Sequence, residues 1–212
     1  MSFFIPFVSG FIAATVGTFP PGLINMTAAK SSITDGRNRA LLFALGATFV
    51  ILIQTYISVI FAQYIDKHKE VVVLLREIGL LIFTVLSVYF LVFAKQPNLT
   101  KQNETLELKS KKSRFFMGML ISAINFFPIP YYVFVSVTLA SYKIFYFNPI
   151  SIYSLVSGAV VGSFCVFYCY IVFFNKIKSK TDYFMLNMNK IIGLITGIVA
   201  LITLLNVLKY YF

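Results

Sequence analysis

The sequence predicts an all-α integral membrane protein whose six transmembrane helices form two inverted repeats of three helices each. Three observations support this prediction. The 212 residues are 59% hydrophobic and 12% charged, with a mean hydropathy of +0.86, which leaves too little polar surface to cover a water-soluble globule. Six apolar segments are each about long enough to cross a bilayer. The first and fourth of these segments are broken by prolines at matching positions.

The expected spans lie in two groups of three on either side of a polar linker. In chain order they are residues 3–30, 40–64, 78–94, 115–140, 150–174 and 191–208. The first repeat is expected over residues 1–94, the basic linker over 95–114 and the second repeat over 115–212, all within a single membrane domain. Because each half has an odd number of spans, the second half should enter the membrane upside down relative to the first.

The two broken spans share one register. Gly10 precedes Pro20 by the same number of residues as Gly118 precedes Pro128, so Phe19-Pro20 aligns with Phe127-Pro128. A proline inside a helix removes the bond to the carbonyl four residues earlier, and the half-helix after the break offers unpaired amides and a positive dipole end. Matched breaks of this kind indicate a transporter with its binding site at the breaks. The alternative is that Pro and Gly only kink membrane helices for packing.

The prolines also predict which carbonyls lose their helical partners. Pro20 and Pro21 should free those of Val16 and Gly17, and Pro128 and Pro130 should free those of Ile124 and Phe126. Freed carbonyls suit an ammonium group, and the amides of a helix start suit a carboxylate.

Candidate solute-binding residues are therefore those that form the breaks and the few polar side chains near them. They are Thr18, Pro20, Pro21, Gly22, Asn25, Gln54, Asn125, Pro128 and Pro130. Thr27, Tyr131 and Tyr132 are second-tier candidates. For Gln54, midway along the second span, an interhelical hydrogen bond and a solute contact are equally good interpretations.

The net charge of +11 resides in the loops and not in the spans. Most Lys and Arg residues fall after spans one, three and five, which places the 95–114 linker in the cytoplasm and both termini outside. If the first span were re-entrant, the amino terminus would move to the cytoplasmic side. This distribution favours contact with anionic lipid and not with nucleic acid.

Few residues suit energy coupling or catalysis. Asp35 and Glu77 are the two candidates for coupling, with a structural ion pair as the alternative role for each. No histidine lies in a span and there is no phosphate-binding loop, so we expect no metal, no cofactor and no enzymatic activity.

Several of these stretches resemble the LysE-type family of amino-acid exporters. The residues that carry the resemblance are Pro20-Pro-Gly-Leu-Ile-Asn-Met-Thr27, Asp35-Gly-Arg-Asn-Arg-Ala-Leu-Leu-Phe-Ala-Leu-Gly-Ala47, Gly118, Asn125-Phe-Phe-Pro128, Gly79 and Gly193. The resemblance implies a six-span carrier of the bacterial inner membrane that exports amino acids or derivatives, driven by protons. The family usually has Pro-Gly-Pro at the first break and a basic residue after the second motif, and this chain has neither.

The sequence thus predicts a secondary exporter of a small zwitterionic solute that works by alternating access at the two breaks. A homo-oligomer is left open. One alternative is a membrane scaffold without transport. A second is a thiol-disulfide carrier, which would need a cysteine beside each break, whereas Cys165 and Cys169 both lie in the fifth span.

Overall fold

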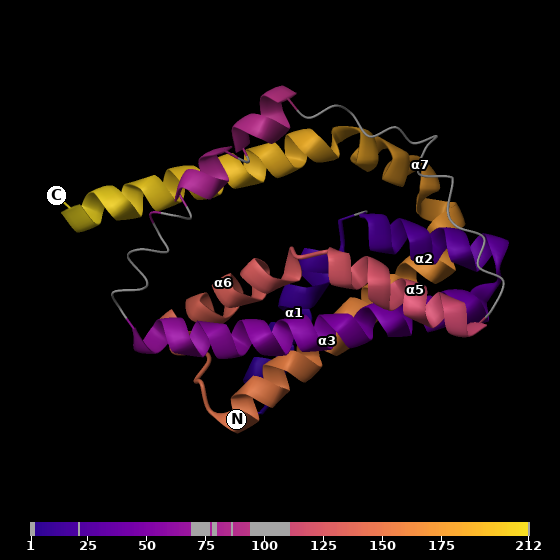
Figure 1. Ribbon diagram of the computed structural model, residues 1–212, viewed down its shortest axis with the longest axis horizontal. Coiled ribbons are helices and arrows are strands. Elements are labelled where there is room, and N and C mark those ends of the chain that lie inside the picture. The colour runs from indigo at the N-terminus through magenta and orange to yellow at the C-terminus, as the bar shows by residue number, and fades with distance from the viewer. Residues whose placement is uncertain are drawn as a thin grey trace. The chain divides into compact units, whose positions relative to one another are not determined.

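A computed structural model describes residues 3–20, 22–68, 77, 80–85, 87–93 and 111–211. Every secondary-structure element in these ranges is helical (Figure 1). The chain divides into two compact units, and each is composed of two separate stretches. The first unit combines residues 1–64 with 106–178, and the second combines 65–105 with 179–212.

The first unit contains two bent helix pairs and two long helices. Helix α1 (Phe4–Thr18) is followed by α2 (Leu23–Thr34) at an angle of 79°, and α5 (Lys111–Ile124) is followed by α6 (Pro128–Ser141). The second pair, counted from residue 113, is bent by 64°. Helix α3 (Arg37–Lys67) and residues 149–173 of α7 (Pro149–Tyr211) are each long and apolar enough to cross a membrane. If each bent pair is one span, four spans are present among the described residues.

Each bent pair ends in a left-handed turn that leads to a long helix. Gly36, with φ of 89°, follows the last residue of α2 and its cap, a position where glycine adopts the left-handed conformation without steric cost. After α6 the residue in the left-handed conformation is Lys143, with φ of 59°. The two bent pairs therefore end in the same backbone geometry.

Two helix crossings bring backbones into direct contact through glycine. A Cβ atom on Gly10 of α1 would lie 2.1 Å from the Leu155 carbonyl oxygen of α7, and one on Gly158 would lie 2.0 Å from the Phe7 carbonyl oxygen. Helices α3 and α5 repeat this arrangement. A Cβ on Gly46 or on Gly118 would lie 2.0 Å from a carbonyl oxygen of the facing helix. Each bent pair is thus held against one long helix by close backbone packing, as small residues permit in membrane proteins.

The second unit contains a short apolar helix, Leu80–Phe93, whose last turn is the π-helix η1 (Tyr89–Phe93). It packs on the carboxyl-terminal part of α7. The Ser87 hydroxyl donates to the Gly193 carbonyl over 2.9 Å, and a Cβ on Gly193 would lie 2.6 Å from the Leu91 side chain. The third expected span, residues 78–94, falls partly in this helix, which is shorter than a helix that crosses a bilayer, and residues 78, 79, 86 and 94 lie outside the described residues.

One expected boundary is wrong. The loop expected between spans 150–174 and 191–208 is absent, because α7 is continuous from Pro149 to Tyr211. No Gly or Pro occurs between Gly162 and Gly193, so nothing in the backbone stops the helix there despite the Lys-rich composition. Helix α5 begins at Lys111, within the linker expected over residues 95–114, and residues 95–110 lie outside the described residues. The arrangement of six spans as two inverted repeats stays a prediction, as does the division of the chain at the linker.

Candidate solute-binding site at the two helix breaks

The first break separates α1 from α2 and is spanned by the side chain of Asn25. Asn25 is the third residue of α2, and its Nδ2 donates to the Thr18 carbonyl over 2.6 Å and to the Pro20 carbonyl over 2.9 Å. Both acceptors belong to the chain before α2. A single amide side chain therefore satisfies two carbonyls that the break leaves without helical partners, which an apolar surrounding requires.

Helix α7 supplies further contacts to the first break. The Tyr170 hydroxyl donates to the Phe19 carbonyl over 2.9 Å, and the hydroxyls of Ser163 and Thr18 lie 3.4 Å apart. Ser163 is fully buried. Three consecutive carbonyls, from residue 18 to residue 20, thus accept hydrogen bonds from side chains. These are not the carbonyls of Val16 and Gly17 that the prolines are expected to free, so that expectation stays a prediction.

The second break, between α5 and α6, is supported from a different helix. Gln54 of α3 donates from Nε2 to the Asn125 carbonyl over 3.0 Å and to the Ser122 carbonyl over 3.3 Å. The side chain of Asn125 accepts a bond from the Phe127 N–H at 3.3 Å, so this amide caps its own turn. The Phe126 carbonyl, expected to be free, accepts from the Ile129 N–H at 3.2 Å.

The two breaks lie next to each other. Tyr131, on the first turn of α6, donates its hydroxyl to the Ala13 carbonyl of α1 over 2.7 Å. Its ring covers Gly17, where a Cβ atom would lie 2.8 Å from the ring carbon Cε1. Only glycine at position 17 leaves room for this ring. One side chain of the second bent pair thus contacts the first pair just before its break, and the predicted site residues gather in one region of the first unit.

Several buried polar atoms in this region have no hydrogen-bond partner among the described residues. They are Asn25 Oδ1, Gln54 Oε1, Thr55 Oγ1, Ser122 Oγ and Ser136 Oγ. Asn25 is 3% exposed and Gln54 is 6% exposed. In both amides the NH₂ group donates to carbonyls of a break, whereas the amide oxygen has no partner among the described residues. Buried polar atoms without partners are costly and are found where water or a ligand completes them.

One ion pair joins the two bent pairs away from the breaks. Asp35, which caps the end of α2, contacts Arg114 on the first turn of α5 with 2.6 Å between Oδ2 and Nη2. The side chains are 15% and 7% exposed. Burial raises the pKa of the Asp35 carboxyl, but hydrogen bonds from Ser31 and Thr34 and the Arg114 guanidinium lower it by more, so the net pKa lies below 3.8. A carboxyl that stays ionised in this way suits a structural role for Asp35 in an ion pair better than a role in carrying protons.

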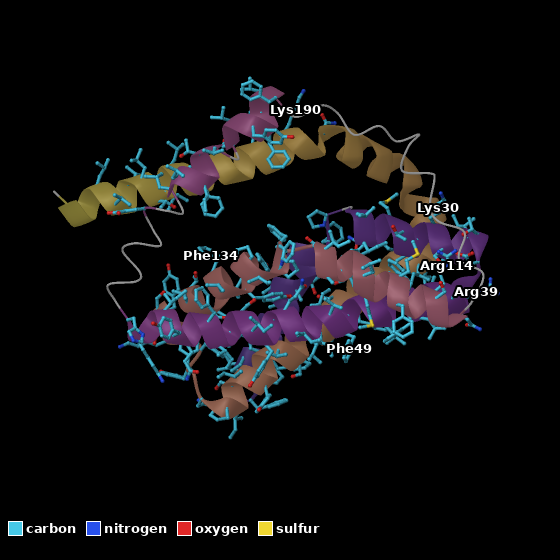
Figure 2. All side chains as sticks on the ribbon, in the orientation of Figure 1. Lys30, Arg39, Phe49, Arg114, Phe134 and Lys190 are labelled. Carbon is cyan, nitrogen blue, oxygen red and sulfur yellow. The ribbon has the colours of Figure 1, made fainter. Side chains whose placement is uncertain are left out.

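The same end of the first unit carries other basic side chains. Figure 2 labels Lys30, Arg39 and Arg114 at this end, on α2, α3 and α5. Arg37 donates to the Tyr168 hydroxyl of α7, with its guanidinium carbon 5.2 Å from the ring centroid. By the charge rule, this end would face the cytoplasm.

The remaining predicted residues are placed as follows. Pro128 is buried, whereas Pro20, Gly22 and Pro130 are exposed. Pro21 lies outside the described residues. Glu77 belongs to the second unit, apart from the breaks in sequence. The described residues contain no group of acidic, His and Cys side chains that could hold a metal.

Two contributors to the site were not predicted. Tyr170 and Ser163 lie on α7 and reach the first break from residues far away in sequence. Their spacing of about two helical turns places both on one face of a helix, but nothing in the sequence says which break that face meets.

A family model described as LysE type translocator matches residues 15–206. The chain belongs to the LysE type translocator family. The matched range contains both breaks, the Asp35–Arg114 pair and most of α7. Comparisons with curated proteins and with solved structures find no match. As a LysE type translocator, the chain is a multi-pass membrane protein that moves a small solute across a lipid bilayer, and the family consists of transporters and not of enzymes.

Proposed function

We propose that this protein is a secondary active transporter that exports a small zwitterionic solute, an amino acid or a derivative, by alternating access at its two broken helices. The single observation that carries the proposal is the meeting of the breaks. Two helix pairs bent by 79° and 64° come together where Tyr131 covers Gly17, and buried acceptor oxygens there have no partner among the described residues. Broken helices that meet in this way are typical of solute sites in secondary transporters.

The wider arrangement belongs to the same proposal. Six spans in two inverted repeats are supported by the two matched glycine crossings, Gly10 with Gly158 and Gly118 with Gly46, and by the left-handed residues that end both bent pairs. An inner-membrane location, a cytoplasmic linker at residues 95–114 and termini on the outside are supported by the basic end of the first unit. Proton coupling and a homo-oligomer rest on no contact described above.

The alternatives have less support. Cys165 and Cys169 are both free and exposed on α7, and neither lies at a break. This placement does not suit a thiol carrier, which passes electrons between cysteines brought together at the site. A scaffold without transport would have no need of unpartnered acceptors at the breaks.

The test is a flux measurement with purified protein in lipid vesicles. We expect labelled amino acids to move in response to an imposed pH gradient and faster than in empty vesicles. A panel that covers neutral, basic and acidic amino acids and shows no flux, with or without a gradient, would exclude the proposal.

A further inference from the structure

The basic end of the first unit, where α2 ends and α3 and α5 begin, is rich in cationic side chains (Figure 2). Arg37 and Arg39 lie in the first turn of α3, and Lys111, Lys112 and Arg114 lie in the first turn of α5. Neither of these two turns contains an acid. The cations also lie at the positive ends of two helix dipoles, where an anion is stabilised and a cation is not. This end therefore favours an anion.

The acid that the described residues provide at this end is already paired. Asp35 Oδ2 lies 2.6 Å from Arg114 Nη2, yet the Nε of the same guanidinium is buried without an acceptor among the described residues. Arg37 and Arg39 have no carboxylate partner within the described ranges. The Arg37 side chain is exposed and that of Arg39 is partly exposed. Donors at this end thus outnumber the acceptors that the described chain offers, and two guanidinium groups are accessible.

Tyr168 of α7 fixes the position of one of these two guanidinium groups. Arg37 donates to the Tyr168 hydroxyl, and its guanidinium carbon lies 5.2 Å from the ring centroid. A guanidinium has five N–H donors in a planar fork that suits two oxygens of one phosphate, so the bond to Tyr168 leaves donors for such a ligand. Because the ring orients Arg37 in advance, binding a phosphate would cost less side-chain entropy.

An apolar face of α7 leads away from Tyr168 along the membrane-spanning segment. Tyr168 lies near the end of residues 149–173, at the level where tyrosines meet lipid headgroups. Val161, Cys165 and Tyr168 are all exposed, and their spacing of four and three residues places them on one face of the helix. An anion that carries hydrocarbon chains would therefore meet Arg37 with its charge and this face with its chains.

We propose that the start of α3 binds the headgroup of an anionic phospholipid. The guanidinium groups of Arg37 and Arg39 contact the phosphate, and Tyr168 holds Arg37 in place. The acyl chains lie along the exposed face of α7 that contains Val161 and Cys165. The bound lipid then joins α3 to α7, so it stabilises the fold. The site lies away from the helix breaks and does not depend on which solute is transported.

The experiment measures lipid binding by the full-length protein in a neutral detergent. The protein is titrated with dioleoylphosphatidylglycerol, and the midpoint of thermal unfolding is followed. We expect the midpoint to rise and then saturate, because a ligand that binds the folded state stabilises it. Dioleoylphosphatidylcholine, which has no net charge, should need an at least about 10-fold higher concentration for the same rise. Glycerol 3-phosphate should give no rise at the concentrations of the lipid, because it has no acyl chains.

The double variant Arg37→Gln with Arg39→Gln removes both proposed contacts. Loss of cations from a helix start does not weaken the helix, so without added lipid the variant should unfold at about the wild-type temperature. We expect its half-saturating concentration of dioleoylphosphatidylglycerol to rise about 30-fold. The matched control is Lys67→Gln with Lys143→Gln, which removes the same charge from exposed positions at the opposite end of α3 and after α6. This control should bind the lipid as the wild type does.

Three results would overturn the proposal. Equal stabilisation by dioleoylphosphatidylcholine would show that the charge of the headgroup is not recognised. Equal stabilisation by glycerol 3-phosphate would assign the basic end to a soluble phosphate and not to a lipid. Equal weakening in the two double variants would show a response to net charge and not a site at α3. The comparison of ligands uses wild-type protein, so it decides the question even if a variant does not fold.

Discussion

The two helix breaks have the same register in the sequence but differ in their chemistry. Both include a Phe-Pro pair, both bend a helix sharply, and both are bridged by a buried amide. At the first, the bridge is Asn25, from the helix that begins there, and that helix has no side-chain cap. At the second, the bridge is Gln54, from α3, and two prolines leave the start of α6 without donors.

The difference separates the features that the two breaks share from those that they do not. The bends and the glycine crossings depend on backbone shape, which Pro and Gly determine locally, so both halves reproduce them. Hydrogen-bond capacity depends on single residues. The position aligned with Gly22 is Pro130, which has no N–H, and the bridging amide comes from α2 at the first break and from α3 at the second.

The largest effect should come from breaking the Asp35–Arg114 ion pair, which joins the two bent pairs away from the breaks. Arg114→Met leaves the Asp35 carboxylate largely buried without its partner, and removal of one member of a buried pair costs about 3–5 kcal/mol. We expect a matching fall in the midpoint of thermal unfolding in detergent. The double variant Asp35→Asn with Arg114→Met should recover most of the loss. If the single and double variants unfold alike, the pair does not hold the bent pairs together.

The next largest effect tests the feature that the halves share. Gly10→Ala and Gly118→Ala each place a Cβ within about 2 Å of a facing carbonyl oxygen, and such overpacking costs about 1–3 kcal/mol. We expect both variants to lower the unfolding temperature by similar amounts. Gly22→Ala is the control, because its Cβ would have no neighbour nearer than 4.0 Å. A variant at one crossing that is tolerated while the other is not would show that the crossings are not equivalent.

The sequence predicted the breaks better than the contacts around them. Pro20, Gly22 and Pro128 act through the local backbone, so their effect can be predicted from position alone. The partners of the freed carbonyls could not be predicted, since Gln54 and Tyr170 reach the breaks across a large separation in the chain. The Lys-rich stretch of α7 has the composition of a loop, which hides the continuity of the helix, although no Gly or Pro interrupts it.

A further effect should come from the two bridging amides. Asn25→Leu and Gln54→Leu each remove two hydrogen bonds to break carbonyls, at a cost of about 1–3 kcal/mol for the groups left unpaired. We expect each variant to lower the unfolding temperature in detergent by a similar amount. A loss in one variant only would show that the two bridges do not contribute equally to the stability of the breaks.

The smallest effect concerns pH and is confined to acid conditions. Because the pKa of Asp35 lies below 3.8 in the folded protein, its ion pair stabilises the fold fully above that value, and the contribution is lost as pH falls through the folded pKa. Stability should therefore not change through this group between about pH 7 and pH 5, and should decline below about pH 4. The Asp35→Asn variant has no carboxyl at this position to protonate, so it does not lose stability through this group at low pH. The difference in unfolding temperature between wild type and variant should therefore narrow as the pH drops below 4. If the difference in unfolding temperature already narrows near neutral pH, Asp35 takes up a proton at that pH. Asp35 would then again be a candidate for proton coupling.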